Sequence, residues 1–167
     1  MSSRLSLKVY PDPSLSTKCL PVEVFGQSLA EVGVAMLAAM REHGGVGLAA
    51  NQVGIHLRLV AMGAEACGGA DVVMANPSLV AREGECELEE GCLSLPGLRA
   101  KVAGRSDTVR VAYQDLDGAE QSMELGGLGA LCIQHEIDHL DGLTMLDHLS
   151  PLKASRAKAK LAKSRRQ

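Results

Sequence analysis

Aromatic residues are nearly absent from this sequence. Its 167 residues include two tyrosines, one phenylalanine and no tryptophan, although 46% of the residues are hydrophobic. The core must therefore be built from Leu, Val, Ala and Met side chains. The length suits one domain, which would bury roughly 70% of the surface that its unfolded chain exposes.

Long apolar runs are missing as well. No stretch approaches the roughly 20 apolar residues that a membrane-spanning helix needs. The first five residues, Met1 to Leu5, lack the apolar segment of a secretory signal peptide. The five cysteines are an odd number without the spacing of a disulfide framework, which favours reduced thiols. We therefore expect a cytoplasmic protein with no membrane partner.

Acidic residues are absent from the end of the chain. All 20 Asp and Glu residues lie at or before Asp147, whereas seven of the 17 basic residues follow Ser150. Pro151 begins an alanine-rich segment, so residues 151–167 are predicted to form a basic C-terminal helix. Such a helix is most often simply solvated, but clustered Lys and Arg also attract RNA and other polyanions.

Hydrophobic periodicity predicts two further helices and several strands. The first helix runs from Ser28 to Gly44, with Ser28 and Glu31 as a capping box, and the second runs from Gly127 to His139. Asp117-Gly118 is a predicted hairpin turn. The predicted strands are 56–61, 72–80, 108–113 and 121–125. We expect an α+β fold, with antiparallel sheets packed around the second helix.

The segment His135-Glu136-Ile137-Asp138-His139 is the most informative motif. On a helix, its two histidines stand one turn apart, so both can bind one metal ion and leave Glu136 beside the ion's open position. No Glu and only one His follow this motif. Thermolysin-like sites, which need a later Glu, are therefore excluded, and so are metzincin sites, which would need a His in place of Met145.

The third metal ligand must come from other residues. Asp147 and His148 are the downstream candidates, and the cysteines are the others. Cys132 shares the helical stripe of the two histidines, but three ligands on one straight helix converge poorly on a tetrahedral ion, and a buried Cys is usually a small apolar residue. Cys92 follows Gly91 in a predicted extended segment, and a thiolate placed opposite the helix would complete the site better.

Three segments in this order resemble the signature motifs of bacterial peptide deformylases. They are 45–52 (GVGLAANQ), 90–94 (EGCLS) and 134–139 (QHEIDH). The glycines of the first segment would also match a dinucleotide fingerprint, but they follow a predicted helix and precede a strand, the reverse of a Rossmann turn. The resemblance extends from about Pro11 to Leu152. It implies one deformylase-like domain over residues 1–167 that removes the formyl group from the N-terminal formyl-methionine of nascent proteins.

The resemblance also implies a role for each residue of the site. Glu136 would be the general acid and base, while Gln52 and the main-chain N–H of Leu93 would stabilise the oxyanion. The ligands of one Fe²⁺ ion per chain would be Cys92, His135 and His139. The general affinity order favours Zn²⁺ for such ligands, and Ni²⁺ or Co²⁺ are further possible substitutes.

Substrate contacts and partners complete the expectations. Val46 and Gly47 would pair with the main chain of the peptide, and Leu131 and Cys132 would line a slot for the methionine side chain. Arg99 matches an arginine that contacts the peptide in the resembled family. In that family a basic C-terminal helix is associated with docking at the ribosome, so residues 151–167 make the ribosome a candidate partner.

Two other functions stay open from the sequence. The first is a zinc peptidase that uses Asp147 or His148 as its third ligand. The second is a non-catalytic, ribosome-associated metal protein with the ligands and the basic tail described above.

Overall fold

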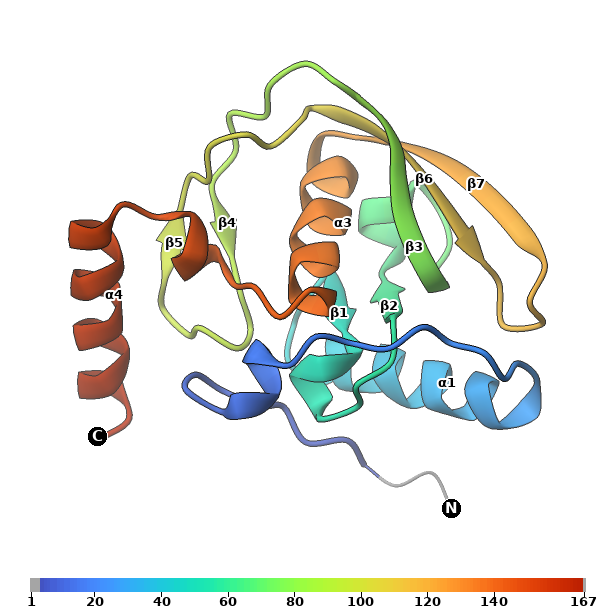
Figure 1. Cartoon of the computed structure of the whole chain (residues 1–167), viewed down its shortest axis with the longest axis horizontal. Coiled ribbons are helices and arrows are strands. Elements are labelled where there is room, and N and C mark those ends of the chain that lie inside the picture. The colour runs from blue at the N-terminus through green and yellow to red at the C-terminus, as the bar shows by residue number, and fades with distance from the viewer. Residues whose placement is uncertain (1–3, 167) are drawn as a thin grey trace.

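The structure is a computed structural model that describes residues 4–166. The predicted domain begins with residues 1–3 and the predicted basic helix ends with Gln167. These four residues lie outside the described residues. Helix α3 (Gly127–Leu140) lies near the centre, with a five-stranded sheet on one side and a two-stranded sheet on the other (Figure 1). The predicted α+β fold around a central helix is confirmed.

The larger sheet is antiparallel throughout, with the strand order β1-β2-β3-β6-β7. Strand β1 lies at one edge of this sheet and is the first strand after the first long helix in the chain. The strands are β1 (Gly47–Ala49), β2 (Leu59–Met62), β3 (Val72–Glu83), β6 (Thr108–Gln114) and β7 (Glu120–Gly126). The smaller sheet pairs β4 (Glu90–Gly91) with β5 (Arg99–Ala100).

The remaining helices cover the edges of this core. They are η1 (Pro13–Ser16), α1 (Gln27–Glu42), η2 (Ala50–Val53), α2 (Ala64–Cys67), η3 (Met145–His148) and α4 (Pro151–Ser164). Helix α1 buries Leu29, Met36 and Met40, which recur at helical spacing, against β1 and β2. Among the described residues, no helix has both the length and the apolar composition needed to cross a membrane.

Helix α3 is buried around most of its circumference, since ten of its 14 residues are buried. Its N-terminal half contributes apolar residues such as Leu131 and Ile133 to the core, while its C-terminal half contains the buried polar side chains of the motif. A buried polar group is costly unless it has a partner, so this end of α3 is where a site is expected. The core is aliphatic and methionine-rich, as predicted, with Met36, Met62 and Met74 fully buried.

Several boundaries differ from the sequence prediction. The capping box of Ser28 and Glu31 is wrong, because α1 begins at Gln27 and follows Gly26, whose φ of 108° only glycine adopts readily. The predicted strand 56–61 begins only at Leu59, because η2 and a turn at Gly54 (φ 80°) precede it. The hairpin turn at Asp117-Gly118 and helix α3 lie where they were predicted. Helix α4 begins at the predicted Pro151 but ends at Ser164, earlier than predicted.

Candidate metal centre

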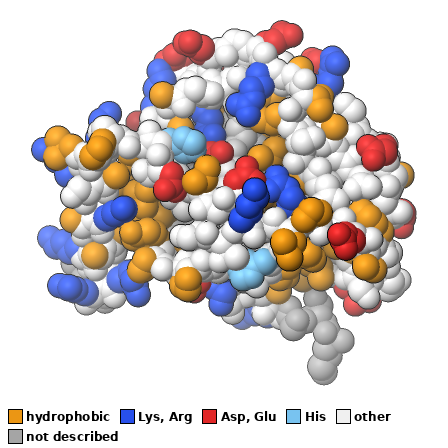
Figure 2. All heavy atoms as spheres, viewed as in Figure 1, with side chains coloured by type: hydrophobic (Ala, Val, Ile, Leu, Met, Phe, Trp, Pro, Cys, Tyr) orange, Lys and Arg blue, Asp and Glu red, His pale blue; other side chains and the backbone are white. Residues whose placement is uncertain are grey.

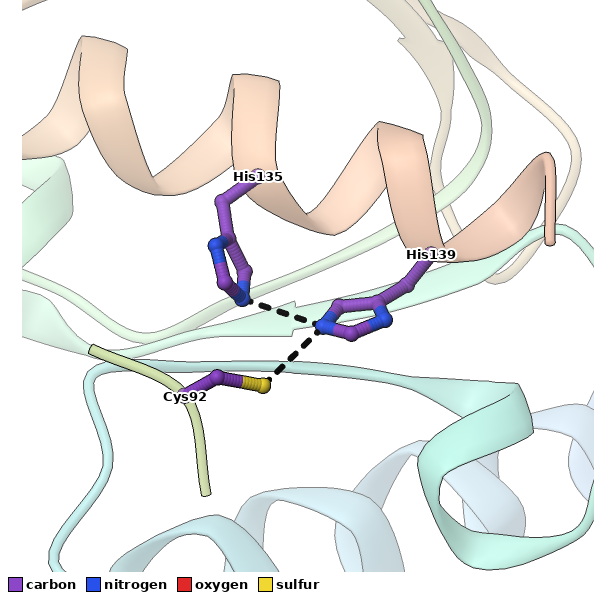
Figure 3. Close-up of side chains that lie close together, drawn as sticks. All are labelled: Cys92, His135 and His139. Carbon is purple, nitrogen blue, oxygen red and sulfur yellow. Dashed lines mark hydrogen bonds between the residues drawn. The ribbon is translucent and has the colours of Figure 1, made fainter. Parts of the chain in front are cut away.

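Two elements present their side chains to one point. His135 and His139 project from successive turns of α3, and Cys92 lies opposite them in the segment that follows β4 (Figure 3). The Nε2 atoms of the two histidines are 3.0 Å apart, and Nε2 of His139 is 3.3 Å from Sγ of Cys92. Within the described part of the chain, this is the one group of three or more His, Cys, Asp or Glu residues whose possible ligand atoms all lie within 4.8 Å of one another.

These separations suit a shared metal ion. In a tetrahedral site with bonds of about 2.0–2.1 Å to His and about 2.3 Å to Cys, the ligand atoms lie roughly 3.3–3.6 Å apart. The observed distances of 3.0 and 3.3 Å are close to this range. Burial lowers the pKa of His139, and the nearby His135 lowers it further, so His139 is held in the neutral form that a metal requires.

The two downstream candidates for the third ligand are engaged elsewhere. His148 donates from Nε2 to Oδ2 of Asp138 at 2.8 Å. Asp147 accepts the N–H of Thr144 at 2.7 Å and so caps the start of the short helix η3. The zinc peptidase with Asp147 or His148 as a ligand is therefore not supported by the arrangement of side chains.

Behind His135 lies a buried ionic network that the sequence did not predict. Nδ1 of His135 donates to Oε1 of Glu90 at 3.0 Å, and both carboxylate oxygens of Glu90 accept hydrogen bonds from Arg105 at 3.0 Å. Arg105 also donates to Asp138 at 2.7 Å. Burial raises the pKa of Glu90, but the hydrogen bonds from His135 and Arg105 outweigh this effect and lower it to about 2. Glu90 is therefore an ionised partner that fixes the imidazole of His135.

Glu136 lies beside the ligands and faces the same cleft. Its side chain is buried, and its Oε2 atom has no hydrogen-bond partner among the described residues. Burial raises its pKa to about 7, although the charge of His135 acts in the opposite direction. The space around it is tight, because a Cβ at Gly47 would lie 2.8 Å from Oε1 of Glu136.

Gln52 is oriented by its own main chain. Its Oε1 accepts the N–H of Ala49 at 2.8 Å, which turns Nε2 toward Ser94 Oγ (3.1 Å) and Cys92 Sγ (3.7 Å). The side chain is almost fully buried although the sequence alone would place a Gln at a surface or turn. Leu93, the neighbour of Cys92, lines the same cleft.

The other predicted residues surround this centre. A cleft of about 1050 Å³ is lined by Val46, Gly47, Arg99, Leu131 and Cys132 as well as by Gln52, Cys92, Leu93, His135 and Glu136. His139, which is fully buried, is the one predicted site residue that does not line the cleft. The side chain of Arg99 is 65% exposed at the rim and donates to the main-chain oxygen of Glu89 at 3.3 Å.

Comparison with known proteins identifies the family of the chain. The family model described as polypeptide deformylase matches residues 5–155, which include all the residues predicted for the site. The chain belongs to the polypeptide deformylase family. The match is longer than the segment from Pro11 to Leu152 over which the sequence motifs suggested a resemblance.

Individual relatives cover nearly the whole chain. A peptide deformylase of Chromobacterium violaceum is 44% identical over 163 residues, 98% of this chain and 97% of its own length. The crystal structure of a peptide deformylase from Legionella pneumophila has a TM-score of 0.91 at 40% identity and covers 98% of this chain and 96% of its own. A peptide deformylase from Ehrlichia chaffeensis in complex with actinonin has a TM-score of 0.91 at 37% identity, with 99% of both chains covered.

Membership of the deformylase family establishes the class of reaction. The chain is a hydrolase that removes the formyl group from the amino terminus of nascent proteins. The Cys-His-His arrangement and the family together indicate a metal cofactor. A non-catalytic metal protein is therefore not the function of this chain.

Proposed function

We propose that Cys92, His135 and His139 hold one divalent metal ion and that Glu136 moves the proton in the deformylation reaction. The observation that carries this proposal is the convergence of the three ligand atoms within 4.8 Å beside a buried carboxylate with a free oxygen atom. The family model covers these four residues, and α4 packs Ala157 and Leu161 onto the rest of the chain. We accordingly treat residues 1–167 as one catalytic domain.

The side chains divide the chemistry between them. A divalent ion would lower the pKa of a water molecule and polarise the formyl carbonyl. Oε2 of Glu136 has no competing partner between residues 4 and 166, so it can accept a proton from water and later donate it to the nitrogen of the departing amine. The Nε2 of Gln52 and the N–H of Leu93 donate to the developing negative charge on the formyl oxygen.

The cleft accounts for recognition of a peptide end. Strand β1 pairs on one side with β2 and is otherwise an edge, so an extended peptide can add to it through main-chain hydrogen bonds at Val46 and Gly47. Leu131 and Cys132 supply apolar surface on the turn of α3 before His135, which suits a methionine side chain. Arg99 at the rim supplies a positive charge and hydrogen-bond donors for the peptide.

We further propose Fe²⁺ as the native ion, with Zn²⁺, Ni²⁺ and Co²⁺ as substitutes. Thiolate and imidazole ligands suit all four ions, and Cys92, which lines the open cleft, is accessible to oxidants. We expect the activity of the iron-loaded protein to decay in air and the nickel-loaded protein to resist air. Full activity of a zinc-only protein at the level of the iron form would contradict this assignment.

The C-terminal helix is proposed to contact ribosomal RNA in the cytoplasm, where nascent chains emerge. Lys and Arg side chains crowd the edge of the molecule over α4, and its basic residues are exposed (Figure 2). A variant with Lys153, Lys158 and Lys163 changed to Gln should bind ribosomes more weakly at low salt while its deformylation of free peptides is unchanged. Ribosome binding equal to that of the unmodified protein would reject this contact.

The reaction itself is tested with a matched pair of variants. Metal-loaded protein is incubated anaerobically with formyl-Met-Ala-Ser and with its acetyl counterpart, and release of formate or acetate is measured. We expect formate release alone, about 10²–10⁴-fold slower in Glu136→Gln and unchanged in Glu124→Gln, which alters an exposed carboxylate. Equal rates for Glu136→Gln and the unmodified protein, with equal metal content, would reject Glu136 as the proton carrier.

A further inference from the structure

Asn51 joins the two halves of the proposed catalytic centre. It lies in η2, directly before Gln52, and its side chain is fully buried. The Nδ2 atom of Asn51 donates to the main-chain oxygen of His139, which is 88 positions away in the sequence. One side chain thus links the element that carries Gln52 to the last turn of the helix that carries the metal ligands.

The position of this hydrogen bond matters because helix ends are weakly held. His139 lies in the last turn of α3, where carbonyl oxygens lack partners within the helix. Its oxygen accepts the N–H of Gly142 at 3.0 Å and the Nδ2 of Asn51. The main chain of Asn51 is itself held, because its oxygen accepts a hydrogen bond from Ser14 Oγ at 2.6 Å. A side chain that extends from a held main chain restrains the position of His139.

The imidazole of His139 has a second requirement. Its Nε2 faces Cys92 and His135, while its other ring nitrogen points away from Cys92 (Figure 3). A neutral imidazole that binds a metal through Nε2 carries its proton on Nδ1, and this N–H normally donates to an outer partner. His135 has such a partner in Glu90, whereas Nδ1 of His139 is buried and has no partner among the described residues.

Few acceptors are available for that proton. The buried side-chain acceptors without a partner in the described chain are Oδ1 of Asn51 and Oε2 of Glu136. Glu136 lines the cleft on the substrate side, so its oxygen faces the reaction. Asn51 is already hydrogen-bonded to the main chain of His139 and has its carboxamide oxygen to spare.

We propose that Asn51 is a positioning residue for the metal ligand His139. Its Nδ2 holds the end of α3 against η2, and its Oδ1 accepts the Nδ1 proton of His139 through one buried water molecule. This inference rests on the proposed metal site. It makes Asn51 the counterpart of Glu90, so that each histidine ligand is oriented by one buried side chain.

The alternative is that Asn51 serves the fold alone, as Asn76 does. Asn76 also has a carboxamide that donates to a main-chain oxygen, that of Val22 at 2.9 Å, but it lies in β3 away from the metal ligands. Loss of either carboxamide should lower the melting temperature of the metal-free protein. Loss of Asn51 should in addition weaken metal binding, which a purely structural role would not do.

Cobalt-loaded protein provides the test. The unmodified protein, Asn51→Leu, Asn51→Ala and the control Asn76→Ala are loaded with Co²⁺, and the thiolate-to-cobalt absorption band is followed after a chelator is added. We expect the Asn51 variants to lose cobalt roughly 10–100-fold faster than the unmodified protein, and Asn76→Ala to lose it at the unmodified rate. Asn51→Ala introduces no bulk, so it serves if Asn51→Leu does not fold.

The outcomes separate this inference from the proposed function. Equal rates of cobalt loss in the unmodified protein and the Asn51 variants would overturn the role of Asn51 and leave the metal site intact. Faster loss in Asn76→Ala as well, at a similar melting temperature, would also overturn it, because general destabilisation would then be the cause. Absence of the thiolate band from the unmodified protein would overturn the metal site and this inference with it.

Discussion

The buried carboxylate of Glu90 accepts a hydrogen bond from Nδ1 of His135 at 3.0 Å. Glu90 is 3% exposed and is held in turn by Arg105, so it is a rigid support rather than a mobile surface charge. Support of this kind fixes the ring of a metal ligand and raises its basicity. The strength of the metal site should therefore depend on a residue that does not touch the metal.

Replacement of Glu90 by Gln should weaken both metal binding and the fold. We expect the metal dissociation constant to rise roughly 10–100-fold, and the free energy of unfolding to fall by about 3 kcal/mol because Arg105 loses the charge of its buried partner. Chelator competition and urea unfolding measure the two effects. Glu87→Gln, which removes the exposed partner of Lys101, is the control and should change neither. Equal metal affinity for the Glu90 variant and the unmodified protein would show that His135 needs no such support.

A methyl group at Gly47 should close the centre sterically. The added Cβ would meet Sγ of Cys132 and lie 2.8 Å from Oε1 of Glu136. We expect Gly47→Ala to lower the free energy of unfolding by about 1–3 kcal/mol and to reduce kcat/KM for a formylated peptide, because Glu136 is displaced. Gly126→Ala adds a Cβ that would meet nothing within 4 Å and should keep kcat/KM unchanged. An unchanged kcat/KM in Gly47→Ala would mean that β1 and α3 move apart to accommodate the methyl group without displacing Glu136.

The amide nitrogen of Gln52 can be tested apart from its oxygen. In Gln52→Glu one oxygen still accepts the N–H of Ala49, so the turn at η2 is retained, while the donor near Cys92 is lost. We expect kcat to fall about 10²–10³-fold and KM to change little, as for the loss of one oxyanion donor. Steady-state kinetics with equal metal occupancy measure this. An unchanged kcat would remove Gln52 from the list of catalytic groups.

The sequence predicted the parts of the molecule whose signals are local. The prediction of helix α3 differs from the structure by one residue, because periodicity and the His-Glu motif lie in the same segment. Geometry favoured Cys92 over Cys132 as the third ligand, whereas Asp147 and His148 stayed open until the structure showed Cys92 beside the two histidines. The extended segment around Gly91 was predicted without its partner strand, and β5 was missed because two residues carry no periodicity.

Contacts between distant residues could not be read from the sequence. Glu90 ends an acidic segment that resembles a solvated surface, and its burial is explained only by Arg105, 15 positions later, and His135, 45 positions later. The link between Asn51 and His139 spans 88 positions. Such contacts depend on the tertiary fold, and no local sequence pattern in either segment predicts them.

Helix α4 is more than a charged appendage. Its residues Ala157 and Leu161 are buried in a cluster with Leu95 and Met145, and Cys92 packs against the same cluster. Lys160 also donates to the main-chain oxygen of Gly97 at 3.2 Å. The apolar face of α4 therefore supports the segment that carries Cys92, the proposed thiolate ligand, while its basic face remains exposed. Truncation after Ser150 would remove both faces at once, so it would not isolate an electrostatic effect.

Two leucines of α4 test how much its buried apolar face contributes to stability. Leu161 is 3% exposed and Leu152 is 61% exposed on the same helix. We expect Leu161→Ala to lower the free energy of unfolding by about 2–3 kcal/mol, because it leaves a cavity in the cluster beside Cys92, and Leu152→Ala to change it by less than about 0.5 kcal/mol. Urea unfolding of the metal-loaded proteins measures both. Faster metal loss in Leu161→Ala alone would show that the cluster holds Cys92 in place, and equal stability of the two variants would show that α4 docks too weakly to do so.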